Sequence, residues 1–220
     1  MVDVQAQIDA VTRAMRTEQI DGARSYVQVI AQDYPVGIDE VWNATTTERI
    51  ARWFLPVTGD LHVGGRYQLT GNAGGEVLSC APPSGGTAGF RATWEFGGSI
   101  SWITVRLTSL APDRTRLELE HTSRVDDIPV EMWQTYGPGA TGVGWDHGLL
   151  GLALHLGALE GQVSPAAAQE WSLSPEGTAF ARAAADRWSD VHVAAGADRE
   201  QAAHAADATF GFYTGHAPDA

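Results

Sequence analysis

The sequence predicts an α+β fold in which a curved antiparallel sheet of about six strands wraps around one long C-terminal helix. Three observations lead to this prediction. Short strand-like runs, separated by Gly, Pro and Asn clusters, fill residues 64–125. A long apolar run with helical spacing follows at residues 142–161, and two Ala-rich helical stretches come after it. We find no repeat and no linker that divides the chain, so we expect a single domain, 1–220.

The first element is a predicted helical arm over residues 1–22. Its apolar residues recur at helical spacing, at Val4, Ile8, Val11 and Met15. Gly22 is a residue that can end such a helix. We expect this arm to pack on the rest of the domain.

A first strand and two short helices are expected next. Residues 26–33 alternate, which places Val27, Val29 and Ala31 on one face of the strand and Gln28 and Gln32 on the other. Residues 37–45 are typical of a short helix. A second helix begins with the capping residues Thr46 to Glu48 and ends at Pro56.

The strands between residues 64 and 125 are expected to form a meander with one buried and one polar face. Alternation assigns the following residues to the buried rows: Tyr67, Leu69, Phe90, Ala92, Trp94, Phe96, Ile103, Val105, Leu107, Leu117, Leu119 and His121. The intervening Arg and Glu residues fall on the opposite rows. The buried face is therefore the one that should meet the long helix.

The long helix, at about residues 142–161, carries apolar residues on two sides. One stripe, which should cover the sheet, contains Trp145, Leu149, Leu152, Leu156 and Leu159. Leu150 and Leu154 lie nearly opposite. We therefore expect the remaining helical segments, 174–195 and 198–213, to cover the back of this helix.

The charge of the chain excludes some partners. The 27 acidic residues exceed the 14 basic ones, which are all Arg, and the formal net charge is −13. This charge repels nucleic acids and anionic membrane surfaces. The lack of Lys excludes Schiff-base chemistry. We expect no nucleic-acid partner.

Cysteine usage and apolar runs indicate the compartment. Cys80 is the single cysteine, so a disulfide framework, a Cys-type zinc site and a dithiol pair are excluded. The first residues have no apolar leader-like core, and no apolar run approaches 18 residues. We expect a cytoplasmic protein without membrane insertion.

Several motifs resemble a known superfamily. They are ARWF followed by GGRY, then WEF, SWITVRL, TRLELEH and the Gly-Trp start of the last core helix in GVGWDHGLLGLALHL. Together they resemble START-like (helix-grip) proteins of the SRPBCC superfamily. More narrowly, the chain is similar to the actinobacterial-type homologues of the activator of the 90-kDa heat-shock protein ATPase. The resemblance covers a core at residues 23–161, and leaves 162–220 as a helical C-terminal extension. It implies a helix-grip fold, which in this superfamily serves lipid carriers, hormone receptors, aromatase/cyclases and co-chaperones.

His121 is the first candidate site residue because it lies in an otherwise apolar row that faces the expected pocket. A neutral imidazole there can orient a ligand oxygen or act as a general base. The alternative is a buried histidine with a local hydrogen bond. Tyr67 adds a hydroxyl to the same face, as a donor to a ligand carbonyl or an enolate-like oxygen.

Aromatic and aliphatic residues on the converging segments are the candidate pocket lining. They are Trp53, Phe54, Tyr67, Trp94, Ile103, Leu119, Trp133, Tyr136, Trp145, Leu149 and Leu152. Each of them could instead serve core packing. His147 and His155 are eight residues apart on the long helix, so we expect no metal site from this pair, and we expect no cofactor. We expect Asp146 either to stabilise the helix N-terminus through the helix dipole or capping, or to lie at the pocket mouth.

Three functions remain open at this point. The leading hypothesis is binding of a small hydrophobic or polycyclic metabolite in an apolar, aromatic-lined cavity. The second is a cofactor-independent cyclase, aromatase or hydrolase-like enzyme that uses His121 and Tyr67. The third is a co-chaperone-like interaction module that uses the tail aromatics Phe210, Phe212 and Tyr213, which could also fasten the tail to its own domain. The protein is expected to be a monomer or a homodimer.

Overall fold

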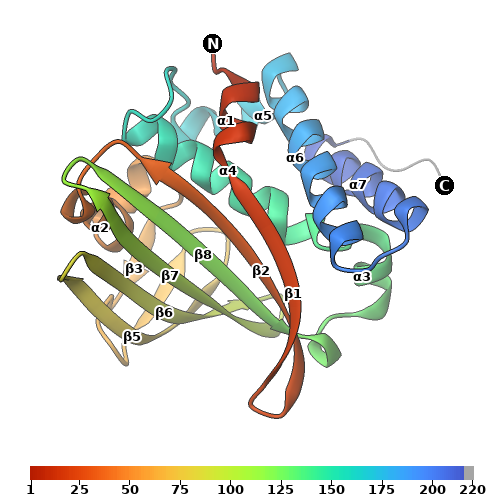
Figure 1. Cartoon of the computed structure of the whole chain (residues 1–220), viewed down its shortest axis with the longest axis horizontal. Helices are drawn as coiled ribbons and strands as arrows, with labels where there is room; N and C mark the ends of the chain where they lie inside the picture. The colour runs from red at the N-terminus through yellow and green to blue at the C-terminus, as the bar shows by residue number, and fades with distance from the viewer. Residues whose placement is uncertain (216–220) are drawn as a thin grey trace.

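An eight-stranded antiparallel sheet forms the body of the computed structural model, which describes residues 1–215 (Figure 1). The strand order is β1-β2-β8-β7-β6-β5-β4-β3, and every neighbouring pair is antiparallel. The bounds are β1 Thr12–Ile20, β2 Ala23–Tyr34, β3 Val57–Gly59, β4 Arg66–Leu69, β5 Gly74–Ser84, β6 Thr87–Phe96, β7 Ser99–Ala111 and β8 Arg114–Arg124. The α+β class and the curved sheet are confirmed, with more strands than the six expected because β1 and the three-residue β3 were not predicted.

Helices lie before, between and after these strands. The α-helices are α1 Val4–Ala10, α2 Ile38–Thr46, α3 Val130–Tyr136, α4 Gly139–His155, α5 Ala168–Ser172, α6 Pro175–Ala194 and α7 Arg199–Thr214. The short 3-10 helices are η1 Glu48–Arg52, η2 Val125–Asp127 and η3 Pro165–Ala167. The two short helices after the first predicted strand are present as α2 and η1, and Thr47 caps η1 by accepting from the Arg49 backbone N–H.

The predicted helical arm over residues 1–22 is wrong beyond Ala10. Helix α1 begins at the Asp3 cap, and Val11 is already extended. The chain then forms β1, which pairs with β2 across a two-residue turn at Asp21 and Gly22, both with positive φ (51° and 78°). An Asp-Gly pair is a strong signal for this tight hairpin turn. Helical spacing holds for Val4 and Ile8 within α1, whereas Val11 ends this helix and Met15 is half-buried on β1.

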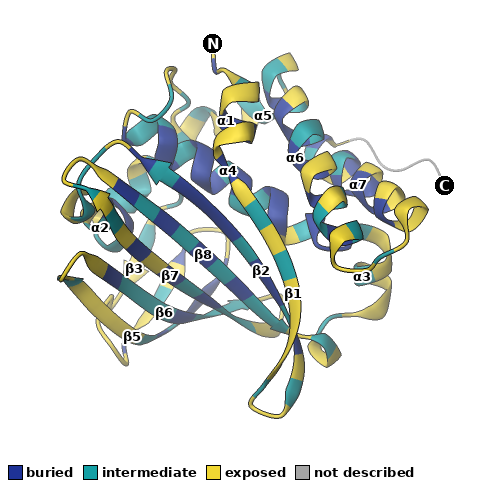
Figure 2. Cartoon of the chain, in the orientation of Figure 1, coloured by how far each residue is buried: buried dark blue, intermediate teal, exposed yellow. Residues whose placement is uncertain are grey.

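The strand rows expected to be buried are largely buried, as the alternating bands along the strands in Figure 2 show. Leu69, Ala92, Val105, Leu107 and Leu119 are among the buried residues. Phe96 is the exception: it is 61% exposed, because β6 ends there at the Gly97-Gly98 turn.

The two Gln residues of β2 are buried on the helix side of the sheet. Gln28 donates to the Pro138 carbonyl at 2.7 Å and accepts from Thr141. Gln32 exchanges two hydrogen bonds with Gln7 of α1, at 2.9 and 3.1 Å. Because all these amide groups have partners, their burial carries little penalty, and they fix the start of α4 and the position of α1 on the sheet.

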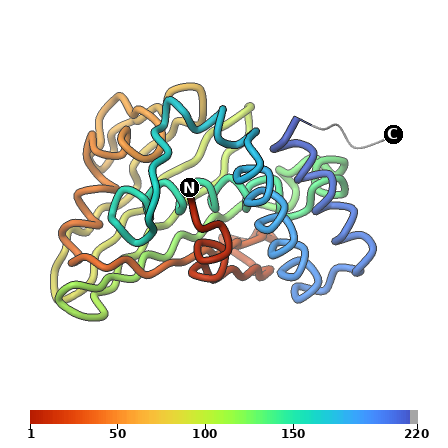
Figure 3. Tube along the Cα trace, turned by 90° about the horizontal axis from the view of Figure 1, so that it is seen from above, coloured from red at the N-terminus to blue at the C-terminus, as the bar shows by residue number. Residues whose placement is uncertain are grey.

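Helix α4 is covered on both sides, as its two apolar stripes predicted. Leu149 and Leu152 face the sheet side, and α6 and α7 pack on the back, running side by side (Figures 1 and 3). Gly142 allows the closest approach there, because a Cβ at this position would lie 2.3 Å from the Trp188 ring of α6. Phe210 and Tyr213 of α7 pack on the core, whereas Phe212 is 64% exposed.

Candidate functional site

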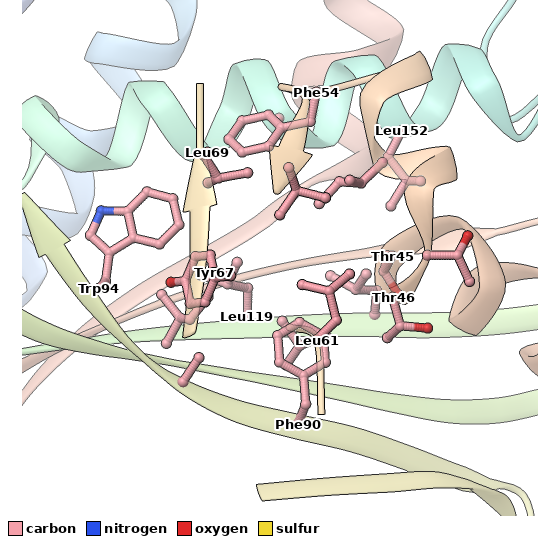
Figure 4. Close-up of a pocket in the computed structure, with 18 of the residues that line it drawn as sticks. Thr45, Thr46, Phe54, Leu61, Tyr67, Leu69, Phe90, Trp94, Leu119 and Leu152 are labelled. Atoms are coloured by element: carbon pink, nitrogen blue, oxygen red, sulfur yellow. The ribbon is translucent and has the colours of Figure 1, made fainter. Parts of the chain in front are cut away.

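A cavity of about 150 Å³ lies between the inner face of the sheet, the α2–η1 segment and α4 (Figure 4). Its wall is built mainly of aliphatic and aromatic side chains, and the described residues that line it include no charged one. Strands β4 to β8 present their inward rows to it, and α4 presents Trp145, Leu149 and Leu152. The alternation along the strands thus produces one continuous apolar surface.

Most of the expected lining residues come together at this cavity. Nine of the predicted residues line it: Trp53, Phe54, Tyr67, Trp94, Ile103, Leu119, Trp145, Leu149 and Leu152. They come from η1 and its continuation, from β4, β6, β7 and β8, and from α4. Long-range packing therefore assembles them from six elements of the chain.

Trp133 and Tyr136 do not lie at the cavity or its mouth, so this part of the prediction is corrected. Trp133 stacks on Tyr26 with ring centroids 4.1 Å apart and meets His192 edge-on. Tyr136 contacts Phe212 of α7. The cause is the path of the chain after β8, where α3 packs on α7 instead of folding over the cavity.

His121 lies behind the cavity wall and does not line it. The imidazole is buried, with 4% of the residue exposed, and Nδ1 accepts from the indole N–H of Trp145 at 3.1 Å. An indole nitrogen can only donate, so Nδ1 carries no proton in this contact. The single N–H of the neutral imidazole is therefore at Nε2, which lies 2.8 Å from Ser101 Oγ. Ser101 in turn donates to the Trp94 carbonyl at 3.1 Å. Burial lowers the pKa of His121 to about 4, and neither ring nitrogen has a lone pair left for a substrate proton.

The Tyr67 hydroxyl, expected as a donor to a ligand, donates to the Thr93 carbonyl at 2.6 Å. Burial raises the pKa of Tyr67 to about 12, so the phenol stays protonated at neutral pH. Its ring forms part of the apolar wall (Figure 4). The side chain therefore contributes shape and apolar surface, with its proton directed at the backbone of β6.

Trp53 and Phe54 close the cavity between η1 and α4. The Trp53 indole N–H donates to the Ala44 carbonyl at 2.9 Å. Its backbone carbonyl lies close to α4 because residue 151 is Gly: a Cβ there would come within 2.2 Å of the Trp53 oxygen. Phe54 lies over Gly148, at ordinary contact distance from where a Cβ would be. Gly151 thus permits this segment to close on the helix, whereas the space beside Gly148 would accept a Cβ.

Several lining residues were not assigned to the site from the sequence. Alternation had placed five of them on the inner rows without a binding role: Leu69, Phe90, Ala92, Val105 and Leu117. The others lie in the α2–η1 segment, at or near β3, in the irregular strand β5 and within α4: Thr45, Thr46, Thr47, Ile50, Val57, Leu61, Val77, Cys80 and Gly148. Leu61 and Cys80 are exposed and mark the open side of the cavity. No periodic signal identifies such rim residues.

Asp146 forms a buried ion pair in place of the expected helix-end or mouth role. It lies within α4, 1% exposed, and accepts from Nε and Nη2 of Arg13 on β1, the shorter contact being 2.5 Å. The Trp188 indole N–H of α6 donates to its second oxygen at 2.8 Å. Arg13 also donates to the Ile8 and Val11 carbonyls. The carboxylate therefore joins three distant parts of the chain.

His147 and His155 lie apart, and residues 1–215 contain no group of three His, Cys, Asp or Glu side chains arranged to hold a metal ion. His147 packs in a ring cluster with Phe180 and Tyr213 behind α4. The Nε2 atom of His155 lies 3.1 Å from Nη2 of Arg49. In the same described part of the chain, every helix is too short or too polar to span a bilayer.

Comparisons with known proteins agree with this fold. The family model described as "Activator of Hsp90 ATPase homolog 1-like protein" matches residues 35–157. The solution NMR structure of CalU16 from Micromonospora echinospora is similar at 33% identity with a TM-score of 0.66, over 84% of this chain and 97% of that one. The crystal structure of CalU16 is similar at 32% identity with a TM-score of 0.56, over 80% of this chain and 98% of that one.

A more distant match shows the fold alone. The conserved protein of unknown function EF2215 from Enterococcus faecalis has 16% identity and a TM-score of 0.51, over 69% of this chain and 79% of that one. None of the curated proteins matches the sequence.

Proposed function

Because the chain belongs to the family of activator of Hsp90 ATPase homolog 1-like proteins and encloses an apolar cavity, we propose that it binds a small hydrophobic or polycyclic molecule there. The observation that carries the proposal is the wall itself, which brings apolar rows of five strands against one stripe of α4 without a charged side chain among the described lining residues. An apolar cavity of about this size stays dry and takes up a molecule of roughly one ring.

The energetics favour an uncharged occupant. Each Å² of apolar ligand surface removed from water contributes about 25 cal/mol, and a pre-formed site avoids much of the ordering penalty. A charged group would lose its hydration and find no counter-charge in the wall. The open side at Leu61 and Cys80 supplies an entry path, and a polycyclic ligand larger than the cavity would extend through it.

Catalysis by His121 is not part of this proposal. Its Nδ1 accepts from Trp145, and with the ring neutral its Nε2–H faces Ser101 Oγ. A general base needs a free lone pair within reach of the substrate proton. The imidazole instead supports the wall of the cavity from behind.

Methyl NMR spectroscopy with naphthalene as the probe tests the proposal. We expect shifts confined to methyl groups of the wall, such as those of Leu69, Val105, Leu119 and Leu152. Val105→Trp places an indole in the cavity and should abolish them. The matched control is Leu110→Trp on the same strand, where the side chain is 49% exposed and binding should persist. Binding that survives Val105→Trp, or shifts spread over the surface, would contradict the proposal.

A further inference from the structure

Three side chains of the wall carry a polar hydrogen that is already donated within the protein. The indole N–H of Trp53 goes to the Ala44 carbonyl, and that of Trp145 goes to His121. The Tyr67 hydroxyl goes to the Thr93 carbonyl. These three aromatic residues therefore offer a ligand their rings and no free N–H or O–H.

The threonines at the rim behave in the same way. Thr45 donates to the Val41 carbonyl at 2.9 Å, and Thr46 donates to the Trp42 carbonyl at 2.6 Å. Their hydroxyl oxygens turn toward α2 rather than toward the other lining side chains (Figure 4). Thr47 likewise donates to the Asn43 carbonyl at 2.7 Å. Hydroxyls bonded to helix carbonyls leave methyl groups as the main threonine surface.

Two other lining side chains carry a polar hydrogen. The indole nitrogen of Trp94 points away from the neighbouring labelled side chains in Figure 4. Cys80 lies at the exposed rim, and a thiol is a weak donor. Among the described lining residues, no side-chain donor is thus aimed into the cavity, and no cation compensates.

From this wall, and resting on the proposed function, we propose that the cavity selects a hydrocarbon-like molecule and rejects ligands that place a carbonyl or carboxylate inside it. An acceptor that enters such a site leaves its hydrogen bonds to water without replacement. The resulting discrimination is about tenfold or more between molecules of equal shape. The ligand class is therefore hydrocarbon-rich over the part that is enclosed, and oxygen functions are confined to the rim or absent.

A near-isosteric pair tests this selectivity: α-methylstyrene and acetophenone differ in one position, where a CH₂ group replaces the carbonyl oxygen. Affinities for the wild-type protein are measured by calorimetry and compared with the partition of each compound from water into cyclohexane and into octanol. Cyclohexane cannot form hydrogen bonds, whereas octanol can. We expect the ratio of the two binding affinities to lie closer to the ratio of the two cyclohexane partition coefficients than to the ratio of the two octanol partition coefficients.

The outcomes separate the two proposals. A ratio closer to the octanol value means that the wall donates to the carbonyl, and it overturns the selectivity while leaving hydrophobic binding intact. If neither compound binds, the proposed function fails and the selectivity fails with it. Loss of both affinities in Val105→Trp, with retention in Leu110→Trp, locates the measured binding in the cavity.

Discussion

The indole N–H of Trp145 donates to Nδ1 of His121 at 3.1 Å, and this contact orients the Trp145 ring, which lines the cavity together with Trp94. Trp145 and Trp94 lie with ring centroids 4.9 Å apart, and the His121 ring meets both edge-on. Ser101 extends the chain of hydrogen bonds to the Trp94 backbone. A polar residue in an apolar row therefore sets the shape of the wall.

This arrangement predicts a loss of stability in mild acid. Burial lowers the pKa of His121 from 6.5 to about 4 in the folded protein. Between these values the unfolded chain binds a proton that the folded one does not, so stability falls as the pH decreases from 6.5 toward 4. At pH 5 the expected loss from His121 is about 2 kcal/mol relative to neutral pH.

Urea unfolding at pH 7.5 and 5.0 measures this loss. His121→Gln keeps a hydrogen-bonding side chain without a titratable group, and should show a smaller difference between the two pH values. Some dependence will remain, since burial also lowers the pKa of His147 and His192. Equal pH dependence in the wild type and in His121→Gln would exclude His121 as a source.

Replacing one partner of the buried Arg13–Asp146 pair should lower the free energy of unfolding far more than the same change in a surface pair. Asp146→Asn keeps the shape but leaves the Arg13 guanidinium, 4% exposed, without a counter-charge. We expect a loss of about 3–5 kcal/mol in the free energy of unfolding, measured with urea. Adding Arg13→Met to this variant should recover part of the loss, since the unpaired buried charge is then removed.

The control for this prediction is Asp207→Asn. Asp207 pairs with Arg182 at 2.8 Å, but its side chain is 71% exposed. Exposed pairs contribute about 0–1 kcal/mol, and the change should lie in that range. A loss in Asp146→Asn no larger than in Asp207→Asn would show that the buried pair is not a main support of the fold.

How much of this molecule the sequence predicts depends on periodicity. The rows of β4, β6, β7 and β8 alternate, and the stripe from Trp145 to Leu152 has helical spacing, so most of the wall was predictable. The rim at Thr45 and Leu61 lies where no period exists. Trp133 was misplaced because its position depends on stacking against Tyr26, a contact between segments more than 100 residues apart in sequence.

The N-terminal segment shows a different source of error. Val4, Ile8 and Val11 fit a helix, but β1 is determined by pairing with β2 and by the Asp-Gly turn. Similarly, Asp146 has the sequence position of a helix-start residue, and its real partners, Arg13 and Trp188, are 133 and 42 residues away. Local patterns cannot reveal such pairings, because they arise from tertiary packing.

Two glycines of α4 should differ in how substitution by Ala changes the stability of the protein. Gly142→Ala would bring a Cβ within 2.3 Å of Trp188, whereas at Gly148 the nearest atom, in Phe54, is 3.7 Å away. We expect Gly142→Ala to destabilise by about 1–3 kcal/mol or more through overpacking. Gly148→Ala should be neutral or stabilise by up to about 1 kcal/mol, because Ala favours the helix.

Thermal and urea unfolding of both variants test this contrast. Gly148→Ala serves as the control for helix propensity, since it changes the same residue type in the same helix. If Gly142→Ala is as stable as Gly148→Ala, Trp188 does not pack against the helix as closely as described.

The contacts of Asp146 also bear on how the protein forms during synthesis. A nascent chain that has just completed α4 already contains Arg13 and every strand of the sheet, but Trp188 has not yet been made. At that stage one side of α4, with Gly142 and Leu150, would face water without the helix that later covers it. The ribosome must therefore add about 60 more residues before this helix has its full surroundings, and the last steps of folding should wait for α6 and α7.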